Sequence, residues 1–175
     1  ALYSRKLKEQ HKDYALTLLE FIQKNHMDLY LCEELQELDL ANQSISSFKN
    51  CIDIKEIQPD LLISLGGDGT ILDTVVLTKL TQTPVLGVNL GRLGFLAGVN
   101  KEESYGAILK FQEGIKNIEE RMLLEVNANI PIFINENIAL NDLTFLRANT
   151  SSMIEVTAYA NGEFLNEYIA DGLII

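Results

Sequence analysis

The sequence of 175 residues has no tryptophan and only two cysteines, Cys32 and Cys51. Two cysteines are too few for a disulfide framework, and neither lies in a Cys-x-x-Cys or Cys/His pattern, so we interpret both as packing residues. With only His11 and His26, a histidine-rich metal site is excluded. No apolar run approaches the roughly 18 residues that span a bilayer, and no charged-then-apolar leader opens the chain. We therefore expect a cytoplasmic protein without a membrane partner.

Basic residues are also scarce. The 14 Lys and Arg residues are outnumbered by 25 Asp and Glu residues, which gives a formal net charge of −11. Such a chain repels a phosphate backbone at long range, so a nucleic-acid partner is not expected. A phosphorylated small molecule is compatible with this charge where backbone N–H groups or a metal ion bind it locally. Apolar residues make up 47% of the chain, which excludes a disordered segment.

Both ends of the sequence lie in apolar segments. The chain opens on Ala1-Leu2-Tyr3 and stops within the run Gly172-Leu173-Ile174-Ile175, which is typical of a buried strand. Native termini are usually polar and frayed. We therefore expect the sequence to be incomplete, at least at its C-terminus.

Strand-like and helix-like segments alternate through the first part of the chain. Residues 10–24 carry apolar side chains at the spacing of an amphipathic helix, and residues 28–32 predict a short strand. Residues 60–65 and 84–89 are typical of strands that are buried on both faces of a parallel sheet. Residues 33–56 are acidic and loosely patterned, and we predict little there.

A helix is expected after each of the two buried strands. The apolar side of the first is expected to contain Ile71, Leu72, Val75, Val76 and Leu80. The second is predicted over residues 101–113, where Asn100 and Glu103 form a capping pair and Gly114 ends the helix. The alternation predicts an α/β domain over residues 1–115, with a parallel sheet covered by helices.

The pattern changes in the last third of the chain. From Arg121 onward there is no helical periodicity, and residues 154–160 alternate between apolar and polar side chains. Asn161-Gly162 then supplies a two-residue hairpin turn before residues 163–169. Residues 118–175 therefore predict an incomplete antiparallel all-β domain.

The most informative segment is the first glycine turn, Gly66-Gly67-Asp68-Gly69-Thr70, between a predicted strand and a predicted helix. Unpaired N–H groups and the helix dipole favour an anion at such a helix start. Glycine lets the backbone approach a phosphate closely. The lysine of a P-loop is absent, so this is not that motif.

An aspartate in the middle of a phosphate-binding turn calls for an explanation. A carboxylate beside a phosphate costs energy unless it binds a metal ion or removes a proton. This argues for phosphoryl transfer, in which Asp68 orients and deprotonates an attacking hydroxyl. The alternative is a structural turn in which Asp68 caps the helix.

The second glycine turn follows the next predicted strand. Residues 87–96 read Gly-Val-Asn-Leu-Gly-Arg-Leu-Gly-Phe-Leu. In an open α/β sheet, ligands bind outside the carboxyl ends of the strands, so we expect both turns to face one crevice. Phe95 either closes over a nucleotide or belongs to the core.

The two glycine turns, with three later segments, resemble the NAD kinases of the bacterial type. The later segments are Glu120–Val126, Ala139–Asp142 and Ala170–Ile175. Gly-Gly-Asp-Gly alone also resembles diacylglycerol kinases, sphingosine kinases and phosphofructokinases, whose α/β domain is Rossmann-like. Gly-Arg-Leu-Gly-Phe and the Asn141-Asp142 pair separate this chain from those families. The resemblance runs from about residue 60 to the end of the sequence.

The resemblance implies ATP-dependent phosphorylation of the 2′-hydroxyl on the adenosine ribose of NAD, which gives NADP. It further implies a divalent cation, Mg²⁺. Independently of the resemblance, the open strand edges of the predicted β domain lead us to expect a homo-oligomer, either a dimer or a tetramer. Two alternatives stay open from the sequence, a lipid kinase and a non-catalytic nucleotide-binding fragment, as does the choice between ATP and polyphosphate as donor. In the family, a further loop that lines the NAD site follows Asp-Gly-Leu-Ile, and this sequence stops before it.

The same resemblance assigns roles to individual residues. Asp68 is the catalytic base, and Phe95 packs near the adenosine. Asn141 and Asp142 hold the adenine and the ribose hydroxyls, where an amide matches the donor and acceptor edge of adenine and a carboxylate accepts from vicinal hydroxyls. Asp171 reaches toward the nicotinamide side. The remaining nucleotide-binding candidates are Gly66, Gly67, Gly69, Thr70 and Leu72.

Overall fold

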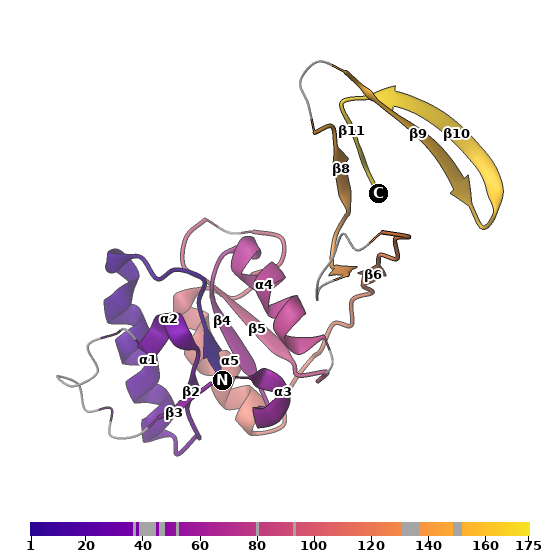
Figure 1. Ribbon diagram of the computed structural model, residues 1–175. Coiled ribbons are helices and arrows are strands. Elements are labelled where there is room, and N and C mark those ends of the chain that lie inside the picture. Colours follow the sequence, from indigo (N-terminus) through magenta and orange to yellow (C-terminus); the bar gives the residue numbers. More distant parts are fainter. Residues whose placement is uncertain are drawn as a thin grey trace. The chain divides into compact units, whose positions relative to one another are not determined.

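The computed structural model describes the chain except residues 37, 39–44, 46–47, 52, 80, 93, 131–136 and 149–151. The chain divides into two compact units, Ala1–Glu120 and Arg121–Ile175 (Figure 1). No helix within the described residues is long and apolar enough to cross a membrane.

The first unit contains a five-stranded sheet in the order β3-β2-β1-β4-β5. The strands are β1 (Leu2–Tyr3), β2 (Tyr30–Leu31), β3 (Lys49–Asn50), β4 (Leu62–Gly66) and β5 (Val85–Asn89). All four neighbouring pairs are parallel. The strand order reverses between β1 and β4, as in Rossmann-like folds. The predicted α/β fold with a parallel sheet is therefore confirmed.

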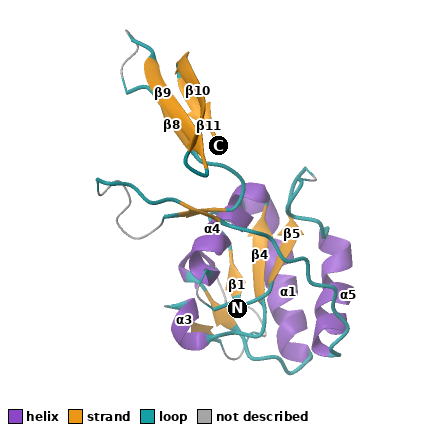
Figure 2. Cartoon of the chain, turned by 90° about the vertical axis from the view of Figure 1, so that its right-hand side faces the viewer, coloured by secondary structure: helices purple, strands orange, loops and turns teal. Residues whose placement is uncertain are grey.

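Helices cover both faces of this sheet (Figure 2). Besides the 3₁₀ turn Glu9–His11, they are α1 (Lys12–Lys24), α2 (Glu33–Gln36), α3 (Ile54–Ile57), α4 (Asp68–Thr78) and α5 (Lys101–Gln112). Successive side chains of a strand point to opposite faces. Ile63 and Leu65 of β4 share one core cluster with apolar residues of α1 and α5, whereas Leu62 packs with α3 and α4. The sheet thus lies between two helical layers.

Local capping signals in the sequence match the structure of α5. The Glu103 N–H donates to Asn100 Oδ1 at 2.8 Å, and the Asn100 N–H donates to Glu103 Oε2 at 3.5 Å, which completes the predicted capping box. Gly114 follows the helix with a φ of 81°. Cys32 and Cys51 are both buried, as the packing interpretation predicted.

The buried side of α4 differs from the prediction. Its buried residues are Thr70 and Thr74, whereas Leu72 is 38% exposed. The Thr74 hydroxyl donates to the Ile71 carbonyl at 2.7 Å, so its polar atom is satisfied inside the helix. Hydroxyl side chains can therefore face the sheet, and an apolar periodicity does not detect them. Leu80, also assigned to the apolar side, lies outside the described residues.

The second unit is built from antiparallel strand pairs, as predicted. The pairs are β6 (Leu124–Glu125) with β7 (Ile138–Ala139), β8 (Thr144–Leu146) with β11 (Gly172–Ile174), and β9 (Ile154–Ala160) with β10 (Glu163–Ala170). Asn161 and Gly162 join β9 to β10 with φ angles of 52° and 87°. Two successive positive φ values are what a type I′ hairpin turn requires.

Candidate functional site

The first glycine turn connects β4 to α4. β4 ends at Gly66, Gly67 is the N-cap, and Asp68 is the first residue of the helix. A Cβ atom at Gly66 would lie 2.1 Å from Thr70 Oγ1, so only glycine fits there. Gly67 and Gly69 are exposed, which leaves the backbone of the helix start open to a ligand. This geometry suits an anion.

Asp68 joins the first glycine turn to the second. Its Oδ2 accepts from the Phe95 N–H at 2.8 Å, and its Oδ1 accepts from the N–H groups of Leu96 at 3.0 Å and Ala97 at 3.1 Å. These hydrogen bonds, that of Phe95 first, lower the pKa of the Asp68 carboxyl below its usual value. The side chain is therefore a carboxylate at neutral pH, and it fixes the position of the residues after Gly94.

The glycines of the second turn have different surroundings. A Cβ atom at Gly94 would lie 2.2 Å from Asp68 Oδ1, whereas one at Gly91 would meet nothing within 4 Å. The Asn89 side chain organises the start of the turn, because it accepts from the Gly91 N–H at 2.7 Å and donates to the Arg92 carbonyl at 2.7 Å. Close approach of the Asp68 carboxylate explains why position 94 is glycine.

Phe95 is 98% exposed, although its N–H is bonded to Asp68. The alternative that its ring belongs to the core is therefore wrong for this structure. This exposed aromatic ring, next to the first residue of α4, is available to a ligand.

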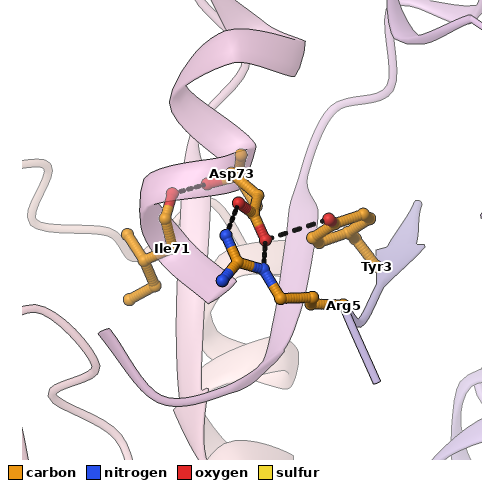
Figure 3. Close-up of polar contacts among 5 residues, drawn as sticks. Tyr3, Arg5, Ile71 and Asp73 are labelled. Atoms are coloured by element: carbon orange, nitrogen blue, oxygen red, sulfur yellow. Dashed lines mark hydrogen bonds and ion pairs between the residues drawn. The ribbon is translucent and has the colours of Figure 1, made fainter. Parts of the chain in front are cut away.

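A charged pair that we did not predict lies beside the first glycine turn (Figure 3). The Arg5 guanidinium donates to both carboxylate oxygens of Asp73, through Nε and Nη2. The Tyr3 hydroxyl donates to the same carboxylate at 3.2 Å. Hydrogen bonding to Asp73 raises the pKa of Arg5, which is charged in any case. The sequence signal that could have indicated this pair is a cation two residues after an apolar opening strand.

The remaining candidates lie in the second unit. Asn141 and Asp142 are exposed in the loop between β7 and β8, where the Thr144 hydroxyl donates to Asp142 Oδ1 at 3.5 Å. Asp171 lies between β10 and β11 and pairs with Arg147 at 2.8 Å. These residues share one unit, whereas Asp68, Phe95 and both glycine turns share the other.

The chain matches the family model of the ATP-NAD kinase N-terminal domain over residues 2–114. It is 34% identical to the NAD kinase of Cytophaga hutchinsonii over its whole length and covers 61% of that protein. The chain thus spans about three fifths of the length of this curated relative. The name of this relative agrees with the resemblance to NAD kinases, and the relatives and structures named here include no lipid kinase.

Two solved structures share the fold. Yeast NADH kinase complexed with NADH has a TM-score of 0.77 at 22% identity, covering 99% of this chain and 52% of that one. An NAD kinase from Archaeoglobus fulgidus in complex with ATP has a TM-score of 0.63 at 20% identity, covering 99% of this chain and 58% of that one. The family model extends over more than half of the 175 residues, and the chain therefore belongs to the ATP-NAD kinase family.

Proposed function

We propose that the intact protein transfers the γ-phosphoryl group of ATP to the 2′-hydroxyl on the adenosine ribose of NAD, forming NADP. The observation that carries the proposal is the joining of two glycine turns, at the carboxyl ends of β4 and β5, through the Asp68 carboxylate. Membership of the ATP-NAD kinase family supports it. The complexes of the structural neighbours with NADH and with ATP agree with both substrate classes.

The first glycine turn would bind the phosphate chain of ATP. The exposed backbone at Gly67 and Gly69 lies at the positive end of α4, and a glycine leaves room for close approach of a phosphate. The close contact between Gly66 and Thr70 would keep the turn in shape, and Leu72 would line the site. A site of this kind needs little covalent chemistry from the protein, because phosphoryl transfer depends mainly on position and charge stabilisation.

Asp68 would orient the attacking hydroxyl and accept its proton. Its lowered pKa makes it a weak base in the ground state. That is compatible with phosphoryl transfer, in which the nucleophile becomes acidic as the new P–O bond forms and positioning contributes most. The three N–H donors would hold the carboxylate in a single orientation toward the substrate.

Four side chains are proposed to contact NAD. Asn141 would pair with the adenine edge and Asp142 with the ribose hydroxyls, while Phe95 packs near the adenosine. Asp171 would face the nicotinamide side. Each side chain has the chemistry for its role, since amides and carboxylates supply the donors and acceptors that a nucleoside presents.

A divalent cation, Mg²⁺, would accompany ATP. Within the described residues no three His, Cys, Asp or Glu side chains come together to hold a metal ion. The Asp68 and Asp73 carboxylates are already hydrogen-bonded. The described residues therefore form no metal site of their own. Mg²⁺ usually keeps several waters and relies on substrate phosphates for its other ligands.

Two further proposals concern the setting of the protein. We propose a homo-oligomer, a dimer or a tetramer, because large apolar side chains of the β9–β10 hairpin, among them Tyr159, Leu165 and Ile169, are 60–71% exposed. Light scattering of the intact protein at micromolar concentration should give at least a dimer, and a monomer would contradict the proposal. We also propose a cytoplasmic location, because the sequence has only two cysteines and both are buried as packing residues.

The direct test is to incubate the intact protein with γ-labelled ATP and, in separate reactions, NAD, diacylglycerol and sphingosine. The proposal predicts label at the 2′-position of NADP and none in either lipid. Polyphosphate replaces ATP in a parallel reaction to identify the donor. Labelled lipid, or nucleotide binding without any transfer, would contradict the proposed function.

A further inference from the structure

We propose that Arg5 binds the phosphate chain of the nucleoside triphosphate, and that Asp73 and Tyr3 hold its guanidinium in place for this purpose. The inference rests on the proposed function, because it names a side chain for the phosphate site at the first glycine turn. Arg5 would be a substrate-binding residue, and Asp73 and Tyr3 would be positioning residues.

The strand order places Arg5 at the carboxyl ends of the sheet strands, where ligands bind in such folds. β1 and β4 are neighbours, and the order reverses between them. Ligands of open α/β sheets bind outside the carboxyl ends of the strands at this reversal. Arg5 follows β1 by two residues, and the first glycine turn begins where β4 ends. The two segments therefore leave the sheet side by side.

The guanidinium lies over the first turn of α4. A Cβ atom at Gly69 would be 3.8 Å from Arg5 Nη1, and the Gly69 backbone belongs to the start of that helix. Asp73 accepts hydrogen bonds from Nε and Nη2 (Figure 3). No hydrogen bond from Nη1 to a described residue is present. The ion pair thus orients the side chain and leaves one edge of its planar fork available. That edge suits phosphate oxygens.

A contribution to folding stability does not by itself explain the Arg5–Asp73 ion pair. The Arg5 side chain is 62% exposed and that of Asp73 is 22% exposed, and exposed ion pairs contribute little to folding. Asp73 nevertheless accepts a further hydrogen bond from Tyr3 on β1. Two residues therefore fix a long, flexible cation next to an exposed helix start, in a chain with a net charge of −11. A cation held beforehand loses less entropy when it binds a ligand.

The test compares Arg5→Ala and Arg5→Lys with Lys6→Ala in the intact protein. Lys6 is exposed, and Lys6→Ala removes a positive charge one residue away from Arg5. The probes are ATP, a non-hydrolysable ATP analogue, adenosine and NAD, each followed by titration calorimetry. We expect Arg5→Ala to weaken ATP and its analogue by roughly tenfold to a hundredfold, the range for a hydrogen bond between charged groups. Adenosine and NAD should bind as in the wild type, and Lys6→Ala should behave as the wild type.

Asp73→Asn separates positioning from charge. This substitution removes a negative charge near the phosphates, so a purely electrostatic effect would strengthen ATP binding. If Asp73 positions Arg5, ATP binding should weaken by several-fold instead. Arg5→Lys keeps the charge but loses the fork, and we expect it to restore only part of the affinity for ATP.

The outcomes distinguish this inference from the proposed function. Unchanged ATP affinity in Arg5→Ala, with NADP still formed, overturns the inference alone. Equal losses for ATP and NAD, together with a lowered unfolding temperature, also overturn it, because they indicate a purely structural pair. A wild-type protein that binds neither ATP nor NAD would remove the proposed function itself.

Discussion

At the scale of single residues, the Asp68 carboxylate determines which positions of the second glycine turn must be glycine. The three N–H groups that bind it lie 27 to 29 residues further along the chain. The sequence indicates a phosphate-binding turn from local spacing alone. It does not indicate this long-range contact, or the one between Arg5 and Asp73, which are 68 residues apart. Such contacts depend on how strands are ordered in the sheet, and no local pattern encodes that order.

Gly94→Ala should be far more harmful than Gly91→Ala. An added Cβ at position 94 would lie 2.2 to 2.5 Å from the Asp68 carboxyl atoms, whereas position 91 offers open space. The turn would have to move away from Asp68 and lose its hydrogen bonds. We expect NADP formation to fall at least tenfold in Gly94→Ala and to stay near wild type in Gly91→Ala, as measured by initial rates. Equal activity of the two variants would show that the joined turns are not required.

Asn141→Ala tests the proposed NAD contact. Loss of the amide would leave the adenine edge without its partner, at a cost of about 1–3 kcal/mol of binding free energy. The affinity for NAD should fall by roughly tenfold or more, and the affinity for ATP should stay nearly constant. Titration of both nucleotides against the variant and the wild type measures this. Equal NAD affinity in the two proteins would exclude Asn141 from the NAD site.

At the scale of elements, helices and strands with a strong local sequence pattern are predictable, whereas elements of two to four residues are too short to show one. α1 and the buried strand β4 are predictable because an apolar pattern extends over several residues in each. β5 is a strand as predicted, but the expectation that it is buried on both faces is wrong, because it lies at one end of the strand order and Val85 is 37% exposed. β1 and β3 have two residues each, and α2 and α3 have four each, so they carry no period to detect. Their structure comes from pairing with distant strands and from packing. The hairpin of β9 and β10 was predictable because Asn-Gly specifies its turn locally.

The contact between α1 and α5 should make stability depend on pH. His11 precedes α1, and its Nδ1 lies 3.1 Å from Lys101 Nζ at the start of α5. Burial first, and then the charges of Lys101 and Lys8, lower the pKa of His11 from 6.5. The unfolded chain therefore takes up a proton near pH 6.5 that the folded chain resists. The free energy of unfolding should decrease as the pH falls below 6.5, until it reaches the lower folded pKa.

Urea unfolding at pH 7.5 and pH 5.5 measures this effect. His11→Gln should show a smaller decrease in stability between the two pH values than the wild type, because it removes the titrating group. His26→Asn is the matched control, since His26 is exposed, has a φ of 57° that asparagine tolerates, and is the other histidine of the sequence. A decrease of the same size in His11→Gln and in the wild type would contradict the assignment.

At the scale of the whole molecule, the order β3-β2-β1-β4-β5 makes neighbours of strands that are far apart in the sequence, so that their carboxyl ends lie side by side. β1 and β4 are separated by nearly sixty positions, yet Tyr3 and Ser64 are paired in register. The alternation of strands and helices predicts a parallel sheet, and the first glycine turn predicts where a phosphate binds. The order of strands adds what the sequence leaves open, namely that the end of β1 is next to that turn.

The role of Asp68 in phosphoryl transfer is tested most directly by the rate of NADP formation, measured for the intact wild-type protein and for its Asp68→Asn variant. The amide keeps the shape of the side chain but cannot accept a proton, and it replaces one acceptor oxygen with an N–H donor facing the second glycine turn. We predict that turnover falls by about 10²–10⁴-fold while nucleotide affinities change little, and that Asp13→Asn, a substitution at an exposed acid of α1, has no effect. An Asp68→Asn protein that retains more than about a tenth of wild-type turnover would contradict the role of Asp68 in phosphoryl transfer.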